Sequence, residues 1–155
     1  MSFRIRGLSP QPFAHLFGRS EAELAALGVT RHVVDAPIGF PDRVELRDLA
    51  PGETALLMNY THLDADTPYR ASHAIFVREG ATEAFDRIDE VPAPFRVRTL
   101  SLRAYDASHA MVDADLVDGK DVESLIARML ARDDVAYIHA HYAKRGCYAA
   151  RIERA

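Results

Sequence analysis

Residues 135–154 constrain the fold more than any other stretch, because they predict two strands joined by a tight turn. Successive side chains of a strand point to opposite faces, so two apolar faces meet only if the numbers of paired residues sum to an even number. Placing Ala143 opposite Cys147 satisfies this rule. It leaves the three-residue loop Lys144-Arg145-Gly146, in which glycine takes the positive φ that such a loop needs.

This register predicts which residues share a face. On the core side it pairs Ile138–Ile152, Ala140–Ala150 and Tyr142–Tyr148. On the other side it pairs His139–Arg151, His141–Ala149 and Ala143–Cys147. Two histidines, an arginine and the only cysteine of the chain are therefore expected on one face.

The rest of the chain predicts strands that mostly follow one another through short turns, with helices near the two ends. The stretch 54–62 is the most apolar and is expected at the centre of its sheet. This order indicates an α+β fold with a mainly antiparallel sheet and helices packed near the two chain ends. The other strands are expected over 3–6, 31–36, 43–46, 73–78, 95–105 (with a bulge between Val97 and Leu100) and 110–117. Helical segments are expected over 12–17, 21–27, 80–87 and 121–130.

Length and charge exclude several classes of protein. A chain of 155 residues fits a single domain, 1–155. Its net charge of −4 is spread along the chain without a basic block, which argues against nucleic acid as a partner. No segment resembles a signal peptide or a membrane span, so we expect a cytoplasmic protein with no membrane partner. Homo-oligomer formation is left open.

The common nucleotide-binding and hydrolase motifs are absent. The chain has no GxGxxG, no Walker A loop, no HExxH and no GxSxG. The sequence therefore leaves open whether the protein is an enzyme.

A metal site is the first hypothesis for the hairpin. His139 and His141 point the same way from one strand, and imidazole suits zinc, iron or nickel. Cys147, His62 or His73 would supply a third ligand. The alternative is that both histidines lie on a solvated face or hydrogen-bond to carboxylates and aromatic residues.

Cys147 is also a candidate nucleophile. His141 could act as its base, and Arg145 and Arg151 are cationic neighbours. The alternative is a thiol that packs as a small apolar group, which is the more frequent role of a lone cysteine.

The loop before the strand at 73–78 presents Tyr69, Arg70 and Ser72. The planar guanidinium of arginine suits a carboxylate or a phosphate. We therefore expect one polar site, built from this loop, the His139/His141 face, His62 and Arg151, that binds a small anionic molecule or a metal.

Two alternatives bear on this site. Arg70 could instead pair with a local acid, Asp64 or Asp66. The protein could also be a non-catalytic interaction or regulatory module whose His/Cys hairpin is structural. If a helix covers the His139/His141 face, the site moves to Arg70; if His62 reaches that face, the site stays at the histidines.

The chain resembles the DUF1203 family, a bacterial domain of unknown function, nearly from end to end. The resemblance rests on FRIRGL at 3–8, 39–41, PGET at 51–54, 60–62, 68–72, 75–78, 139–141 and 146–147. It supports His62, Arg70, His139, His141 and Cys147 as matching positions.

The resemblance also has three departures. The family commonly has Gly-Pro where this chain has His73-Ala74, which weakens His73 as a ligand. It often has asparagine in place of Tyr142. It often has cysteine in place of Asp42, which removes a partner for Cys147.

Overall fold

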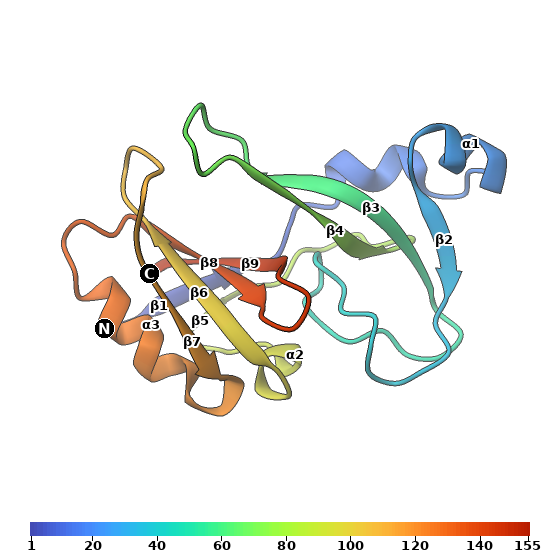
Figure 1. The fold of residues 1–155 in the computed structure, drawn as a ribbon. Coiled ribbons are helices and arrows are strands. Elements are labelled where there is room, and N and C mark those ends of the chain that lie inside the picture. Colours follow the sequence, from blue (N-terminus) through green and yellow to red (C-terminus); the bar gives the residue numbers. More distant parts are fainter.

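The chain folds into two antiparallel β-sheets with short helices beside them, in a computed structural model that describes residues 1–155 (Figure 1). The larger sheet has the strand order β5-β1-β9-β8-β6-β7, and the smaller has the order β2-β3-β4. This confirms the predicted α+β class with mainly antiparallel pairing. The strands are β1 Phe3–Arg6, β2 Thr30–Val33, β3 Thr54–Leu63, β4 Ala71–Arg78, β5 Asp86–Ile88, β6 Thr99–Tyr105, β7 Met111–Asp118, β8 Tyr137–Tyr142 and β9 Cys147–Arg154. The helices are η1 Gln11–Leu16, α1 Glu21–Ala26, α2 Ala93–Arg96, η2 Gly119–Asp121 and α3 Val122–Leu130.

Helix α3 covers one face of the large sheet, and both chain termini lie at this end of the molecule (Figure 1). Its apolar residues recur at helical spacing and are all buried in a cluster of 19 residues. Burying a large apolar side chain contributes roughly 1.5–3 kcal/mol, so this stripe holds α3 on the sheet. The stripe consists of Val122, Leu125, Ile126, Met129 and Leu130. None of the helices combines the length and the apolar character that crossing a bilayer requires.

Strand β3 is the central strand of the small sheet, as predicted. Met58 on β3 pairs with Ile75 on β4, and both belong to a second core of ten buried residues. Further along the same two strands Tyr60 pairs with His73, so this face of the sheet changes from apolar to polar. Because β4 packs against β9, the polar end lies where the two sheets meet.

The register of the β8–β9 hairpin agrees with the prediction in its outer part only. Three of the predicted pairs are confirmed: Ile138–Ile152, His139–Arg151 and Ala140–Ala150. Nearer the turn, His141 pairs with Tyr148 and Tyr142 with Cys147, because a bulge inserts Ala149 into β9. The predicted pairs His141–Ala149, Tyr142–Tyr148 and Ala143–Cys147 are therefore wrong.

The bulge changes which side chains share a face. A bulge opposes two residues to one and so reverses the alternation beyond it. Tyr148 joins the histidines, with its ring centroid 5.0 Å from that of His139. Cys147 moves to the face of Tyr142 and packs against the main core, so the prediction that Cys147 lies with the histidines is also wrong. The turn spans 143–146, and Gly146 has the expected positive φ of 77°.

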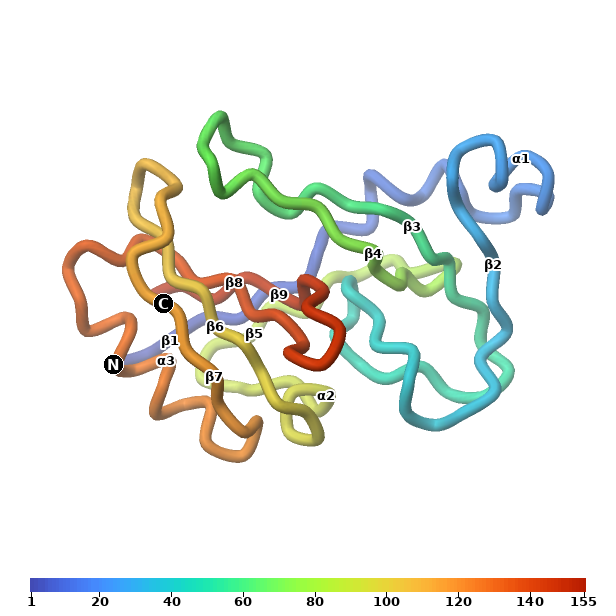
Figure 2. Tube along the Cα trace, viewed as in Figure 1, coloured from blue at the N-terminus to red at the C-terminus, as the bar shows by residue number.

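Three other local predictions are wrong. No strand forms over 43–46, and the only pairing nearby consists of two isolated bridges, at Pro41 and Asp42. These residues belong to an irregular loop over 34–53, which returns to the β8–β9 turn (Figure 2). The segment 80–87 is not helical. Residues 81–85 are irregular, and Asp86–Ile88 pairs with β1 as the edge strand β5. The long strand and bulge over 95–105 are replaced by the helical turn α2 and a strand that begins at Thr99.

Candidate metal centre

Four histidines from three strands meet where the two sheets pack together. His62 comes from β3, His73 from β4, and His139 and His141 from β8. The ring centroid of His62 lies 5.0 Å from that of His73, 5.0 Å from that of His139 and 4.9 Å from that of His141. His62 therefore reaches the face of β8 that carries His139 and His141. This is the condition under which the candidate site stays at the histidines.

Bulges in two strand pairs bring these rings together. In β3 the pairing passes from Thr61 directly to Leu63, so His62 is the extra residue. The bulge in β9 lies opposite His141 and places Tyr148 in the cluster, where its ring stacks on His62 with the centroids 4.9 Å apart. Bulges are frequent beside functional sites because they re-aim a side chain.

The hydrogen bond of His141 defines its tautomer. Its Nδ1 lies 3.0 Å from the carbonyl oxygen of Gly146, which can only accept, so Nδ1 carries the proton and donates it. In the neutral ring the other nitrogen, Nε2, then has a free lone pair. Nε2 of His141 is buried and has no hydrogen-bond partner.

The other two rings show the same shortage of partners. Nδ1 of His62 lies 2.9 Å from Nδ1 of His139, so one of these nitrogens donates to the other. When His62 donates, its Nε2 has a lone pair, and this nitrogen is also buried without a partner. Nδ1 of His73 is the third buried nitrogen without one. His62, His73 and His141 each offer one ring nitrogen within 4.8 Å of the others.

Burial keeps these rings neutral near pH 7. Loss of solvent lowers the pKa of His62 to about 4 and that of His141 to about 3, and the positive charge of Arg103 adds to both shifts. The same cause lowers the pKa of His73. Desolvation, followed by the neighbouring His62, lowers the pKa of His139 to about 2. Neutral imidazole is the form that binds a metal.

The loop residues predicted to bind an anion are exposed and lie outside the linings of the two main cavities. Arg70 forms an ion pair with Asp64, with 2.6 Å between Nη2 and Oδ1, and both side chains are more than half exposed. The sequence offers pairing of Arg70 with a local acid as the alternative to anion binding, and the structure shows this pairing with Asp64. Tyr69 and Ser72 are exposed as well, and none of the three lines either main cavity.

Arg151 lies at the edge of the cluster. It pairs with His139 in register, and its guanidinium carbon stands 4.1 Å from the ring centroid of Tyr137. With His62 and His139 it lines a cavity of about 420 Å³.

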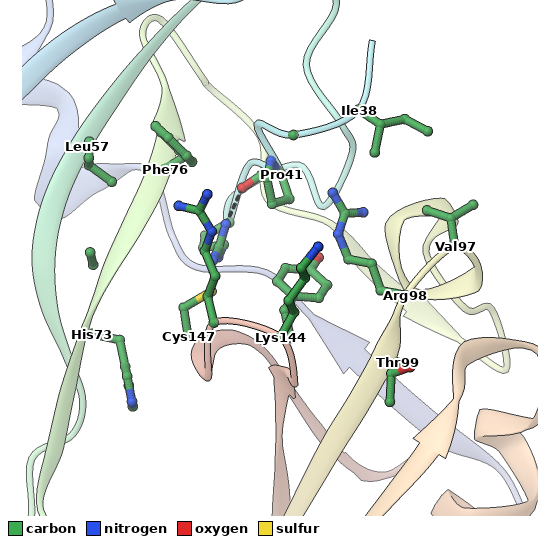
Figure 3. A pocket seen from close by; sticks show the side chains of 15 residues that line it. Ile38, Pro41, Leu57, His73, Phe76, Val97, Arg98, Thr99, Lys144 and Cys147 are labelled. Atoms are coloured by element: carbon green, nitrogen blue, oxygen red, sulfur yellow. Dashed lines mark hydrogen bonds between the residues drawn. The ribbon is translucent and has the colours of Figure 1, made fainter. Parts of the chain in front are cut away.

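Cys147 contacts an arginine to which the sequence alone assigns no role. Its Sγ accepts a hydrogen bond of 3.0 Å from Nη2 of Arg43, a residue only 1% exposed. No periodic pattern marks Arg43, and two of its three hydrogen-bond partners, Tyr148 and Cys147, are about a hundred residues away along the chain. Arg43, Cys147 and His73 line a second cavity, of about 600 Å³, which we call the basic cavity (Figure 3).

Comparison with known proteins gives one match. No curated protein and no solved structure matches the chain. A family model described as a protein of unknown function (DUF1203) matches residues 39–154, a range that includes all four clustered histidines. On this match over most of its length, the chain belongs to the DUF1203 family.

Proposed function

We propose that the protein binds one divalent transition-metal ion, with zinc as the first candidate, through His62, His73 and His141. The observation that supports this proposal most is the set of three buried ring nitrogens without hydrogen-bond partners. The same three residues offer ring nitrogens within 4.8 Å of one another. An unsatisfied buried polar group costs about 1–3 kcal/mol, and a metal would satisfy all three together.

The surrounding hydrogen bonds favour the same assignment. Metal-binding histidines usually donate their second N–H to a carbonyl or another acceptor, which orients the ring. His141 does so through Gly146, and His62 can do so through His139. His139 is thus a positioning residue in this proposal, and Cys147 is outside the ligand set.

The donor set indicates the class of metal and of chemistry. Three neutral imidazoles without a carboxylate suit zinc, copper, iron or nickel better than magnesium or calcium. Nitrogens about 2.0–2.1 Å from a tetrahedral zinc are about 3.4 Å apart, and a separation of this size lies within the 4.8 Å limit of the three ring nitrogens. A three-histidine site keeps one position for water or a further ligand.

The test uses untagged, metal-free protein and matched His→Gln variants. We expect one zinc per chain in the wild type and its loss in H62Q, H73Q and H141Q, measured by calorimetry and by metal content after desalting. H15Q is the control, because His15 is exposed on η1 and its ring makes no hydrogen bond. H139Q should weaken binding by about 10–100-fold, as expected of an outer partner.

A failure of the wild type to retain zinc, iron, nickel or copper in stoichiometric amount would contradict the proposal. It would favour the alternative of a non-catalytic module whose histidine cluster is structural. An anion at Arg70 has less support, because Asp64 already occupies the guanidinium of Arg70.

A further inference from the structure

We infer that the basic cavity binds a small organic anion, a carboxylate or a phosphate ester with an apolar body. The anion is held by Arg43, Lys144 and Arg145. This site is distinct from the three metal-binding nitrogens and does not require the metal.

Arg43 carries a buried charge without a counter-charge. Its Nε donates to the carbonyl oxygen of Tyr148 at 2.7 Å, its Nη1 to that of Pro41, and its Nη2 to Sγ of Cys147. These acceptors use three of the five N–H groups of the guanidinium, and none is a carboxylate. A buried charge costs several kcal/mol unless an opposite charge compensates it.

The nearest acid in sequence does not supply that compensation. The carboxylate of Asp42 accepts hydrogen bonds from the backbone N–H groups of Glu45 and Arg78 instead. Burial, the largest cause, raises the pKa of this carboxyl above its usual value. Arg43 therefore has no carboxylate partner within the chain.

The other cations of the cavity add to the same charge. Lys144 and Arg145 lie exposed in the β8–β9 turn and form no ion pair. Arg98 is the exception, because Asp48 pairs with both of its terminal nitrogens at 2.7 and 2.9 Å. The 15 lining residues include no aspartate or glutamate, although the whole chain has a net charge of −4. Three uncompensated positive charges thus surround one cavity.

A hydroxyl without a partner lies among these cations. Tyr142 lines the cavity, is 5% exposed, and its hydroxyl oxygen is buried without a hydrogen bond. The guanidinium carbons of Arg43 and Arg98 stand 5.1 and 4.9 Å from the centroid of its ring. A ligand oxygen would satisfy this hydroxyl and the free N–H groups of Arg43 together.

The remaining walls are apolar, which indicates an organic ligand. Leu57 and Phe76 line one side and Val97 the other, with Lys144 and Cys147 between them (Figure 3). Val97 and Ile38, at the rim, are each 59% exposed. A volume of about 600 Å³ is within the range of small-molecule sites. His73 also lines this cavity, so the anion would lie beside the metal.

The test uses phenyl phosphate as the probe and benzyl alcohol as its neutral counterpart. Metal-free protein is titrated by calorimetry, and the rate of Cys147 alkylation by iodoacetamide is followed. Cys147 is the only cysteine, so the modification reports on this cavity alone. We expect one bound phenyl phosphate per chain, slower alkylation in its presence, and no effect of benzyl alcohol.

Matched charge variants test which cations hold the anion. K144Q/R145Q removes the two exposed cations of the cavity and should weaken binding about tenfold. K120Q/R87Q removes two exposed cations outside the cavity and should bind as the wild type does. Thermal unfolding of both variants checks that they remain folded.

Three results would overturn the inference: no binding of phenyl phosphate, equal affinity in both double variants, or binding that appears only after zinc is added. The last result would place the anion on the metal. Because the titration uses metal-free protein, anion binding can fail while zinc binding succeeds, and the reverse.

Discussion

Acidification from pH 7.5 to 5.5 should destabilise the metal-free protein through its buried histidines. His139 and His141 are 3% and 0% exposed, and burial lowers their pKa values to about 2 and about 3. In the unfolded chain both rings titrate near 6.5. Below that pH the unfolded state binds protons that the folded state excludes, so this stability is present above about pH 6.5 and is lost as the pH falls.

The magnitude follows from the distance between the pH and the unfolded pKa. At pH 5.5 each ring costs about 1.4 kcal/mol, because the medium is one unit below the unfolded pKa and far above the folded one. The two rings together cost about 3 kcal/mol, which is a large part of a typical stability of about 5–15 kcal/mol. The half-buried His62 changes stability in the same direction.

Urea unfolding followed by circular dichroism at the two pH values measures this loss. H139Q should lose about 1.4 kcal/mol less than the wild type between pH 7.5 and 5.5, because glutamine does not titrate. H15Q, which alters an exposed ring, should show the full loss. Equal stability of the wild type at both pH values, or an unchanged loss in H139Q, would refute the reasoning.

Three further substitutions test the fold and the location of the site. G119A should destabilise by about 2 kcal/mol or more, because its new Cβ would stand 1.7 Å from the carbonyl oxygen of Phe95; a wild-type melting temperature would contradict this close approach. M129A should cost about 2–5 kcal/mol in urea unfolding, because Met129 is fully buried on the face of α3 that packs in the main core. A loss below about 1 kcal/mol would mean that α3 packs loosely. R70A removes only an exposed ion pair, so it should change stability by less than about 1 kcal/mol and leave the binding of zinc and phenyl phosphate intact. Weaker binding of either ligand would show that the loop of Arg70 belongs to the site.

The hairpin shows how far side-chain alternation can predict pairing. From Ile138 to Ala140 the pattern of apolar residues permits one register, and the structure has that register. At Tyr148 the pattern is ambiguous, because tyrosine has an apolar ring and a polar tip and is stable on either face. The bulge places Tyr148 on the histidine face. The alternation of apolar and polar residues does not predict where such an extra residue is inserted.

The members of the histidine cluster could be predicted only in part. His139 and His141 share a face by spacing alone, but His62 lies 77 residues before His139 and reaches it only through the packing of the two sheets. The glycine that the family commonly has at the position of His73 argues against this residue as a ligand, yet in this chain its ring lies beside His62. The ligand set depends on tertiary packing, which one sequence does not display.

The burial of Arg43 could not be predicted from the sequence. A charged residue in a segment with proline and other charges is normally exposed, so sequence reasoning assigns no role to it. Its burial depends on the carbonyl oxygen of Tyr148 and on Sγ of Cys147, both supplied by the β8–β9 hairpin.

X-ray absorption at the zinc edge of the zinc-loaded, untagged protein tests the proposed metal centre most directly. The proposed set of His62, His73 and His141 predicts imidazole nitrogens at about 2.0–2.1 Å and no sulfur ligand. H141Q should lose the imidazole signal, and H15Q should keep it. A sulfur atom at about 2.3 Å from zinc would restore Cys147 to the ligand set, and either that result or the absence of bound zinc would contradict a centre built from these three histidines.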